Sequence, residues 1–304
     1  MKSSYMSLRV KKTRTNTTRK NMGITKLKKC PRSRRTGMES FKINCGKNLL
    51  NTIKGAEETS TDKDDFVNVS LAKLSDYNKP VVVKVYDVKN FHLPLERRIL
   101  ERITGFRNTA KLICDFECDD DKQRYVEKMR THMKFCGVGN DKLHFFVYEY
   151  IAHGDISDYL KTITDYDTIK HLILQLACVI IELESIYHIY HNDLNSGNLL
   201  IDTYAEYTIE YCIDGEPVHI PSHGIMPKLI DYGRSNFYDN RNGTNIWFDI
   251  LMILGVVHRY IRNEQYEKRL TAIAETVDMV LPRRIDYYNY LAGNLRFPAP
   301  LPFS

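Results

Sequence analysis

The chain has 304 residues, of which 43% are hydrophobic and 27% charged; this is enough to bury a full core and is typical of a soluble protein. Its longest apolar run, residues 250–257, is far shorter than the roughly 20 residues that a membrane-spanning helix needs. The first residues are basic and polar with no apolar segment behind them, so we expect neither a signal peptide nor membrane association.

The net charge of +6 is unevenly distributed. Residues 1–35 contain thirteen Lys or Arg and no acid, and subtracting 13 from +6 leaves −7 for residues 36–304. Because residues 1–40 also lack apolar periodicity, we expect them to form a disordered basic arm. Such an arm binds nucleic acid or another polyanion, directs the protein to the nucleus, or only keeps it soluble.

The seven cysteines are scattered along the chain. Their odd number and irregular spacing do not form a disulfide framework, and Cys114-x-x-x-Cys118 has no second pair to complete a zinc site. We therefore expect inert thiols and an intracellular protein, in the cytoplasm or the nucleus.

The first part of the body reads as mostly β-structure with one helix. Strands are predicted at 66–73 and at 80–86, where β-branched residues cluster, and again at 111–117 and 142–150. The segment 93–103 has the pattern of a short helix between the second and third of these strands.

The second part reads as mostly helical. Apolar residues recur at three- and four-residue intervals over 166–189, and a further apolar helix is predicted around 247–260. Short strands are expected at 199–202 and 228–231, with a hairpin turn at Asp214-Gly215 between them. The proline-rich tail, 297–304, should be extended.

Two short motifs carry the chemistry. His191-Asn-Asp-Leu-Asn-Ser-Gly-Asn198 precedes one predicted strand, and Ile230-Asp-Tyr-Gly233 ends the next. Phosphoryl transfer requires a carboxylate near the acceptor hydroxyl and oxygen ligands for Mg²⁺. Singly, such Asp and Asn residues are usually turn or capping residues, but two motifs in this order, joined by a short strand, favour a phosphotransferase site.

In these motifs the sequence resembles the protein kinase superfamily, whose catalytic loop reads H-x-D-L-x-x-x-N and whose metal motif reads D-F-G. The resemblance implies that Asp193 is the catalytic base, Asn198 a metal ligand and Asp231 the main metal ligand. Tyr232 replaces the usual Phe.

Further family positions follow in order from about residue 55 to about residue 260. The resemblance makes Lys84, in Val-Val-Val-Lys, the phosphate-binding lysine and Glu96 its ion-pair partner, with Glu101 as a rival. The remaining matches imply an adenine and ribose site and a brace for the catalytic loop. They are Val69 at the end of the glycine-rich loop, Tyr148 as gatekeeper, Glu149 and Ile151 as backbone contacts to adenine, Asp155 as the ribose contact, and Asp249 as the brace.

The sequence departs from the family at several positions. Asp62, Asp64 and Val67 occupy the glycine positions of the phosphate loop, where acids should repel phosphate. Asn192 replaces the arginine before the base. Asn195 stands where the family has a lysine, and we group it with the catalytic residues. Only 18 residues separate Asp231 from Asp249, a shortening that resembles haspin-type kinases and the divergent kinases of large DNA viruses.

The sequence thus predicts an α+β, protein-kinase-like, two-lobed fold: an arm (1–40), a β-rich N-lobe (41–150) and a reduced, mostly helical C-lobe (151–304). The implied activity is ATP- and Mg²⁺-dependent phosphorylation of Ser or Thr on a protein substrate. We expect the protein to be a monomer and to act inside a cell, which could be a host cell, or in a virion. Three alternatives remain: a small-molecule phosphotransferase of the same fold, a pseudokinase scaffold, and a protein whose arm does the work while the body docks on nucleic acid.

Overall fold

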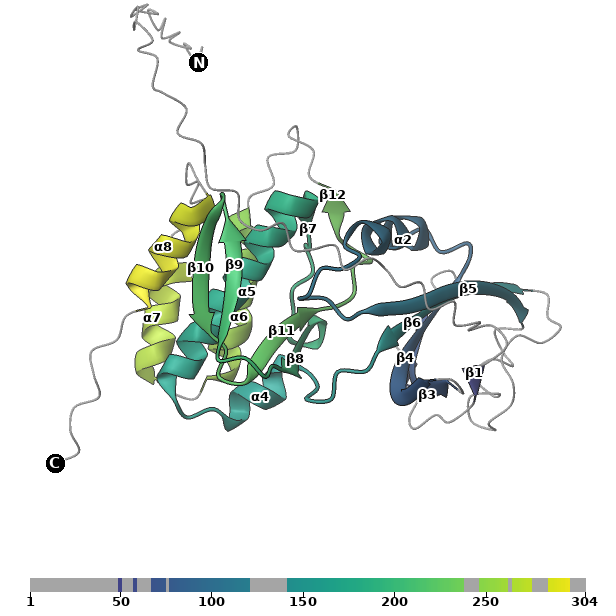
Figure 1. The fold of residues 1–304 in the computed structure, drawn as a ribbon, viewed down its shortest axis with the longest axis horizontal. Helices are drawn as coiled ribbons and strands as arrows, with labels where there is room; N and C mark the ends of the chain where they lie inside the picture. The colour runs from purple at the N-terminus through teal and green to yellow at the C-terminus, as the bar shows by residue number, and fades with distance from the viewer. Residues whose placement is uncertain are drawn as a thin grey trace, which may run out of the picture.

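The computed structural model describes residues 49–50, 57–58, 67–74, 77–120, 141–237, 246–261, 264–274 and 284–295. The expected arm (1–40), Asp62 and Asp64, and the proline-rich tail (297–304) lie outside these described residues. Within them the fold is mixed α/β, with a β-rich N-terminal region followed by helices, as expected. Figure 1 shows the large sheet at one end of the molecule and most helices at the other.

The N-terminal region is built on one antiparallel sheet. Its strands run in the order β1-β3-β4-β6-β5, with β2 also paired to β3. Their bounds are β1 Leu49–Leu50, β2 Glu57–Glu58, β3 Val67–Leu74, β4 Tyr77–Asp87, β5 Leu112–Asp120 and β6 Asp141–Glu149.

Strand β4 occupies the middle of this sheet and is buried on both faces. Val81, Val83 and Val85 alternate onto one face, whereas Lys84 and Tyr86 point to the other and are equally shielded. A lysine in such a strand needs a partner, because an unpaired buried charge is strongly unfavourable. The sequence of β4 therefore sets up an ion pair as well as a core.

Helix α2 (Leu93–Arg102) connects β4 to β5 and supplies that partner. A proline in its first turn suits a helix start, where no N–H donor is needed. Its buried face consists of Leu93, Glu96, Ile99 and Leu100. Glu96 therefore lies among apolar side chains.

The helical region centres on α5 (Tyr166–Tyr187), whose side chains from Leu172 to Glu184 are all buried. Its N-cap, Asp165, accepts hydrogen bonds from the backbone of the first turn. Helix α4 precedes it, and α6, α7 and α8 complete the region. Their bounds are α4 Ile156–Thr162, α6 Ile246–Tyr260, α7 Glu264–Ala274 and α8 Arg284–Asn294.

Three two-stranded ribbons accompany these helices: β7 (Ile189–Tyr190) with β12 (Asn236–Phe237), β8 (Leu199–Thr203) with β11 (Ile225–Leu229), and β9 (Thr208–Ile213) with β10 (Glu216–Pro221). The β9–β10 hairpin turns at the predicted Asp214-Gly215, and both residues have the positive φ that a tight two-residue turn requires. In Figure 1 the β8–β11 ribbon lies between the helices and the large sheet.

The cysteines differ in part from the expectation. Cys178 is a free, buried thiol on α5, but Cys114 and Cys212 are disulfide-bonded. The prediction that the cysteines are unpaired was therefore wrong for these two, since irregular spacing in sequence does not exclude proximity in space.

Among the described residues no helix is long and apolar enough to cross a membrane.

Candidate active site

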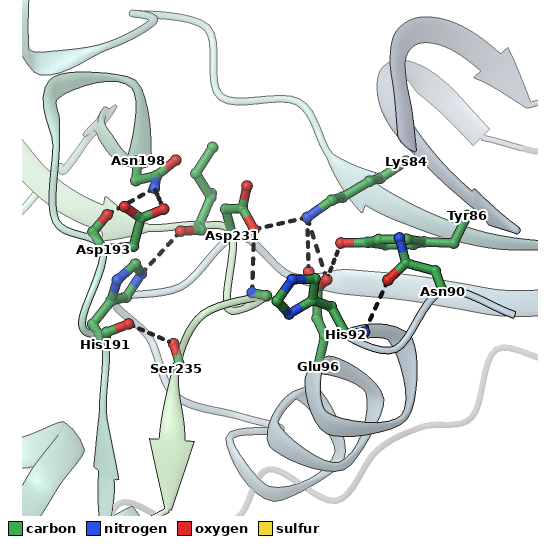
Figure 2. A network of polar contacts seen from close by, with 12 residues as sticks. Lys84, Tyr86, Asn90, His92, Glu96, His191, Asp193, Asn198, Asp231 and Ser235 are labelled. Atoms are coloured by element: carbon green, nitrogen blue, oxygen red, sulfur yellow. Dashed lines mark hydrogen bonds and ion pairs between the residues drawn. The ribbon is translucent and has the colours of Figure 1, made fainter. Parts of the chain in front are cut away.

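Lys84, Glu96 and Asp231 meet where three elements converge. The Nζ atom of Lys84, from β4, lies 3.1 Å from Oε1 of Glu96 on α2 and 2.8 Å from Oδ1 of Asp231, which follows β11. Figure 2 shows the lysine between the two carboxylates. Burial alone would lower the pKa of Lys84, but the charges of Glu96 and Asp231 outweigh it and raise the pKa above its ordinary value. Lys84 is thus held as a cation.

The choice between Glu96 and Glu101 is decided by helix phase. Glu96 is almost completely buried, whereas Glu101 is exposed and pairs with Arg97 on the same helix, 3.6 Å away. Five positions at 3.6 residues per turn leave two side chains about 140° apart around the helix axis, so the two acids cannot share the face toward β4. Glu96 is the partner of Lys84.

Tyr86 is a member of this cluster that sequence reasoning missed. Its hydroxyl donates a hydrogen bond to Oε2 of Glu96, so the carboxylate is held by two side chains of β4. Burial, and then the charge of Glu96, raise the pKa of Tyr86 far above its ordinary value, which keeps the phenol protonated as a donor. The signal was available: Tyr86 is two residues after Lys84, and side chains of a strand repeat on one face every two residues.

The segment after β7 is anchored by Asp249 on α6. Its carboxylate accepts the backbone N–H of His191 at 3.0 Å and that of Asn192 at 3.1 Å. Burial raises the pKa of Asp249 to about 6, opposed by these two hydrogen bonds. Each carboxylate oxygen of Asp249 thus accepts one backbone N–H of the loop, which is the geometry expected of a residue that braces it.

Asp193 and Asn198 face each other across this loop. Nδ2 of Asn198 donates to the backbone oxygen of Asp193 at 2.8 Å and to its Oδ2 at 3.2 Å. Asn195 is engaged by the loop itself: its Oδ1 accepts from Gly197 N at 2.9 Å and its Nδ2 donates to Asp193 O at 3.3 Å. These bonds make Asn195 the cap of the short 3₁₀ turn Ser196–Asn198.

Asp231 links the Lys84–Glu96 ion pair to the loop of Asp193 and Asn198. The backbone N–H of Ile230 donates to Asn198 O at 3.1 Å, and its carbonyl accepts from Nε2 of His191 at 3.0 Å, so Asp231 is fixed beside the loop. Its φ of +61° is unusual for a residue with a side chain, and such conformations concentrate at functional sites. Burial would raise its pKa, but the charge of Lys84 lowers it below the ordinary value, so Asp231 is ionised.

The donor set suits a hard divalent cation. The amide nitrogen of Asn198 is committed to Asp193, which leaves its amide oxygen as a ligand atom. The Asp231 side chain is 43% exposed, and its Oδ2 has no protein partner among the described residues. Amide and carboxylate oxygens are the ligands Mg²⁺ prefers, with water and phosphate completing the shell. Asn198 and Asp231 therefore fit the predicted metal-binding role.

The sheet places one of the predicted nucleotide-binding positions directly beside Lys84. Val69 on β3 is the direct cross-strand partner of Lys84, so both side chains share one face of the sheet. Tyr148 and Glu149 end β6, and the side chain of Glu149 accepts from Lys111 N at 2.8 Å. Ile151 follows and is buried.

Asp155 caps α4 with one oxygen only. Its Oδ1 accepts the backbone N–H groups of Ser157 and Asp158, at 2.8 and 3.3 Å, whereas Oδ2 has no partner among the described residues. The cap sits beside β8 through a bridge to Leu200. Asp155 is thus an ordinary cap that retains one acceptor for a ligand.

No known protein-family profile matches the chain. The curated proteins that are similar to part of it include two named serine/threonine-protein kinase haspin. The Bos taurus protein is 28% identical over 122 residues, which are 38% of this chain and 15% of that protein. The Mus musculus protein is 28% identical over 107 residues, 35% of this chain and 14% of that protein.

The chain thus spans about a seventh of the length of the curated relatives it matches. This partial similarity indicates a protein-kinase-like relationship, and the mixed α/β fold is compatible with it.

Proposed function

We propose that the chain is an ATP- and Mg²⁺-dependent protein kinase that phosphorylates Ser or Thr, with a two-lobed kinase-like architecture. The observation that carries the proposal is the assembled site: Lys84 lies between Glu96 and Asp231, and Asp231 is tied through Ile230 to the loop of Asp193 and Asn198. The similarity to haspin supports the kinase assignment and the choice of Ser and Thr as acceptors.

The residues divide the work as phosphoryl transfer requires. Lys84 would hold ATP phosphate oxygens, and Glu96 would keep its ammonium group in place. Asp193 would orient the acceptor hydroxyl and accept its proton. Asn198 and Asp231 would hold Mg²⁺, which supplies charge neutralisation for the phosphates.

The test is transfer of radiolabelled γ-phosphate to casein and to peptides bearing Ser, Thr or Tyr, with Mg²⁺ or with a chelator. We expect Mg²⁺-dependent labelling of Ser or Thr peptides that Asp193→Asn and Asp231→Asn abolish. Asp158→Asn is the matched control, because Asp158 is an exposed acid on α4 that pairs with nearby Lys161. Labelling that survives Asp193→Asn would contradict the proposed roles.

The same preparation separates the rival functions. ATP with Mg²⁺ should raise the melting temperature, since a ligand at a hundred times its Kd adds about 2.7 kcal/mol to stability. Stabilisation by ATP without transfer to any protein or peptide would favour the pseudokinase scaffold. Transfer to an aminoglycoside or a sugar alone would favour the small-molecule phosphotransferase. No stabilisation would remove the nucleotide site.

A further inference from the structure

Arg234 is an exposed cation held next to the proposed base. Its Nη1 lies 3.9 Å from Oδ1 of Asp193, and its side chain is 73% exposed. The other Asp193 oxygen, Oδ2, is occupied by Asn198. A contact of 3.9 Å in solvent contributes little to stability, so this ion pair is not what holds Arg234 in place.

The backbone that carries Arg234 is fixed on both sides. Ser235 N–H donates to Tyr232 O at 3.1 Å and closes a turn with Gly233 and Arg234 at its tip. Tyr232 is buried with its hydroxyl on Thr109 at 3.0 Å, and Ser235 is buried with its hydroxyl on His191 O at 3.0 Å. A solvated side chain thus projects from a turn anchored to the loop of Asp193.

The charge balance of the site leaves a need for such a cation. Asp193, Asp231 and Glu96 are acids, and Lys84 is committed to two of them. Asn195, two residues after the base, is neutral and caps its own turn. His191 cannot contribute a charge at neutral pH, because burial lowers its pKa to about 4. Mg²⁺ held by Asn198 and Asp231 would offset part of this negative charge, and Arg234 is a cation that the structure places at Asp193 itself.

We propose that Arg234 is a catalytic residue that contacts the transferred phosphoryl group, an inference that rests on the proposed function. The acceptor hydroxyl oxygen forms a bond to the γ-phosphorus while the bond from that phosphorus to the β–γ bridging oxygen breaks. The electron pair leaves on ADP, and the hydroxyl proton passes to Asp193. The guanidinium of Arg234 moves from Asp193 Oδ1 to the γ-phosphoryl oxygens, whose geometry its planar donors match.

The decisive variant is Arg234→Ala, with Arg259→Ala as control because Arg259 is an exposed arginine on α6. We expect Arg234→Ala to lower kcat about tenfold or more and to leave the KM for ATP nearly unchanged. An arginine fully engaged with the transferred phosphoryl group raises kcat by about 10³–10⁵, and solvent screening of the exposed Arg234 charge should make its effect smaller. Arg234→Lys should retain part of the rate. Added guanidinium ions at non-denaturing concentration should partly restore Arg234→Ala, whereas sodium at equal ionic strength should not.

A second measurement does not need turnover. Calorimetry compares the affinity for Mg²⁺-ADP with that for Mg²⁺-ADP plus fluoroaluminate, which mimics the phosphoryl group in flight. The wild-type protein should gain affinity from the fluoroaluminate, and Arg234→Ala should lose most of that gain while binding Mg²⁺-ADP normally.

The outcomes distinguish the two claims. If the wild type transfers phosphate and Arg234→Ala does so equally, the role of Arg234 is overturned and the kinase function stands. A slow variant that guanidinium fails to restore and that keeps the fluoroaluminate gain would also overturn it. If the wild type transfers nothing, the proposed function fails, and Arg234 is then judged by the calorimetry alone: a fluoroaluminate gain that requires Arg234 supports the contact, and any other result excludes it.

Discussion

At the scale of single residues, the carboxylate of Glu96 has two donors on the same strand, the ammonium of Lys84 and the hydroxyl of Tyr86. In the proposed reaction, Lys84 would release part of its contact with Asp231 when phosphate and metal enter. Tyr86 has no such task, and it can hold Glu96 in place throughout. We therefore assign Tyr86 to positioning the Lys84–Glu96 pair.

Replacing Tyr86 by Phe removes that hydroxyl and leaves the ring. Because hydrogen bonds to charged groups contribute about 1.5–3 kcal/mol, we expect urea unfolding to show a loss of this order. Tyr204→Phe is the control, since its hydroxyl bonds Glu206 at 3.2 Å at an exposed site, and it should cost much less. Equal losses in the two variants would show that burial of the Tyr86–Glu96 bond contributes nothing.

His191 is buried and neutral, with Nε2–H donating to Ile230 O. Burial lowers its pKa from 6.5 to about 4, so between these values the unfolded chain binds a proton that the folded protein does not. The contribution of neutral His191 to the free energy of unfolding is therefore complete above about pH 6.5 and is lost as the pH falls toward 4.

The stability difference between wild type and His191→Gln should therefore shrink on acidification. From pH 7 to pH 5 we expect a decrease on the order of 2 kcal/mol, measured by urea unfolding at each pH. Asp249, whose raised pKa acts in the opposite direction, is present in both proteins, so its effect cancels to first order. A difference that stays constant with pH would mean that His191 titrates in the folded state as it does when unfolded.

At the scale of elements, β11 brings Asp231 to the site, and the segment before β5 holds β11 in place. Leu229 N–H donates to Asn108 O at 2.7 Å, and Nδ2 of Asn108 donates to Pro227 O at 2.8 Å. Ala110 N–H donates to Leu229 O at 3.3 Å. The β-rich region and the strand that precedes Asp231 are thus joined through two backbone hydrogen bonds and the side chain of Asn108.

Asn108→Ala should loosen this junction. The side chain is fully buried, and its loss leaves Pro227 O without that donor, at a cost of about 1–3 kcal/mol. We expect faster amide exchange at Leu229 than in the wild type, measured by hydrogen–deuterium exchange. Asn294→Ala is the control, because its Nδ2 donates to Tyr290 O on the exposed side of α8. Unchanged exchange at Leu229 would show that the backbone bonds alone hold β11.

Sequence reasoning found the parts of the site that are contiguous or periodic. The loop of Asp193 and Asn198 is a short continuous motif, and helix phase separates Glu96 from Glu101 once Lys84 is identified. Contacts between distant segments could not be found in this way. The bonds of Asn108 to β11 depend on how the chain folds back, which no local pattern records.

At the scale of the whole molecule, charge is divided between the ends of the chain. The first 35 residues carry +13, and the remaining 269 carry −7. The acidic body alone should be repelled by nucleic acid, so any affinity for a polyanion must come from the arm. The arm has thirteen basic residues, no acid and no motif that recognises particular bases. We therefore expect it to contact nucleic-acid phosphate groups without base specificity.

Deleting residues 1–35 should therefore abolish most binding to a random duplex DNA, measured by fluorescence anisotropy at several salt concentrations. A protein making about six phosphate contacts loses roughly 10³-fold in affinity between 50 and 200 mM salt, and we expect a steep salt dependence of this kind only for the full chain. An arm of the same composition in scrambled order should bind equally, whereas one with its Lys and Arg changed to Gln should not. The truncated protein should keep the melting temperature of the full chain. Equal DNA affinity with and without the arm would contradict the polyanion role, and binding that depends on the order of the arm residues would point to a receptor that reads them, as nuclear import does.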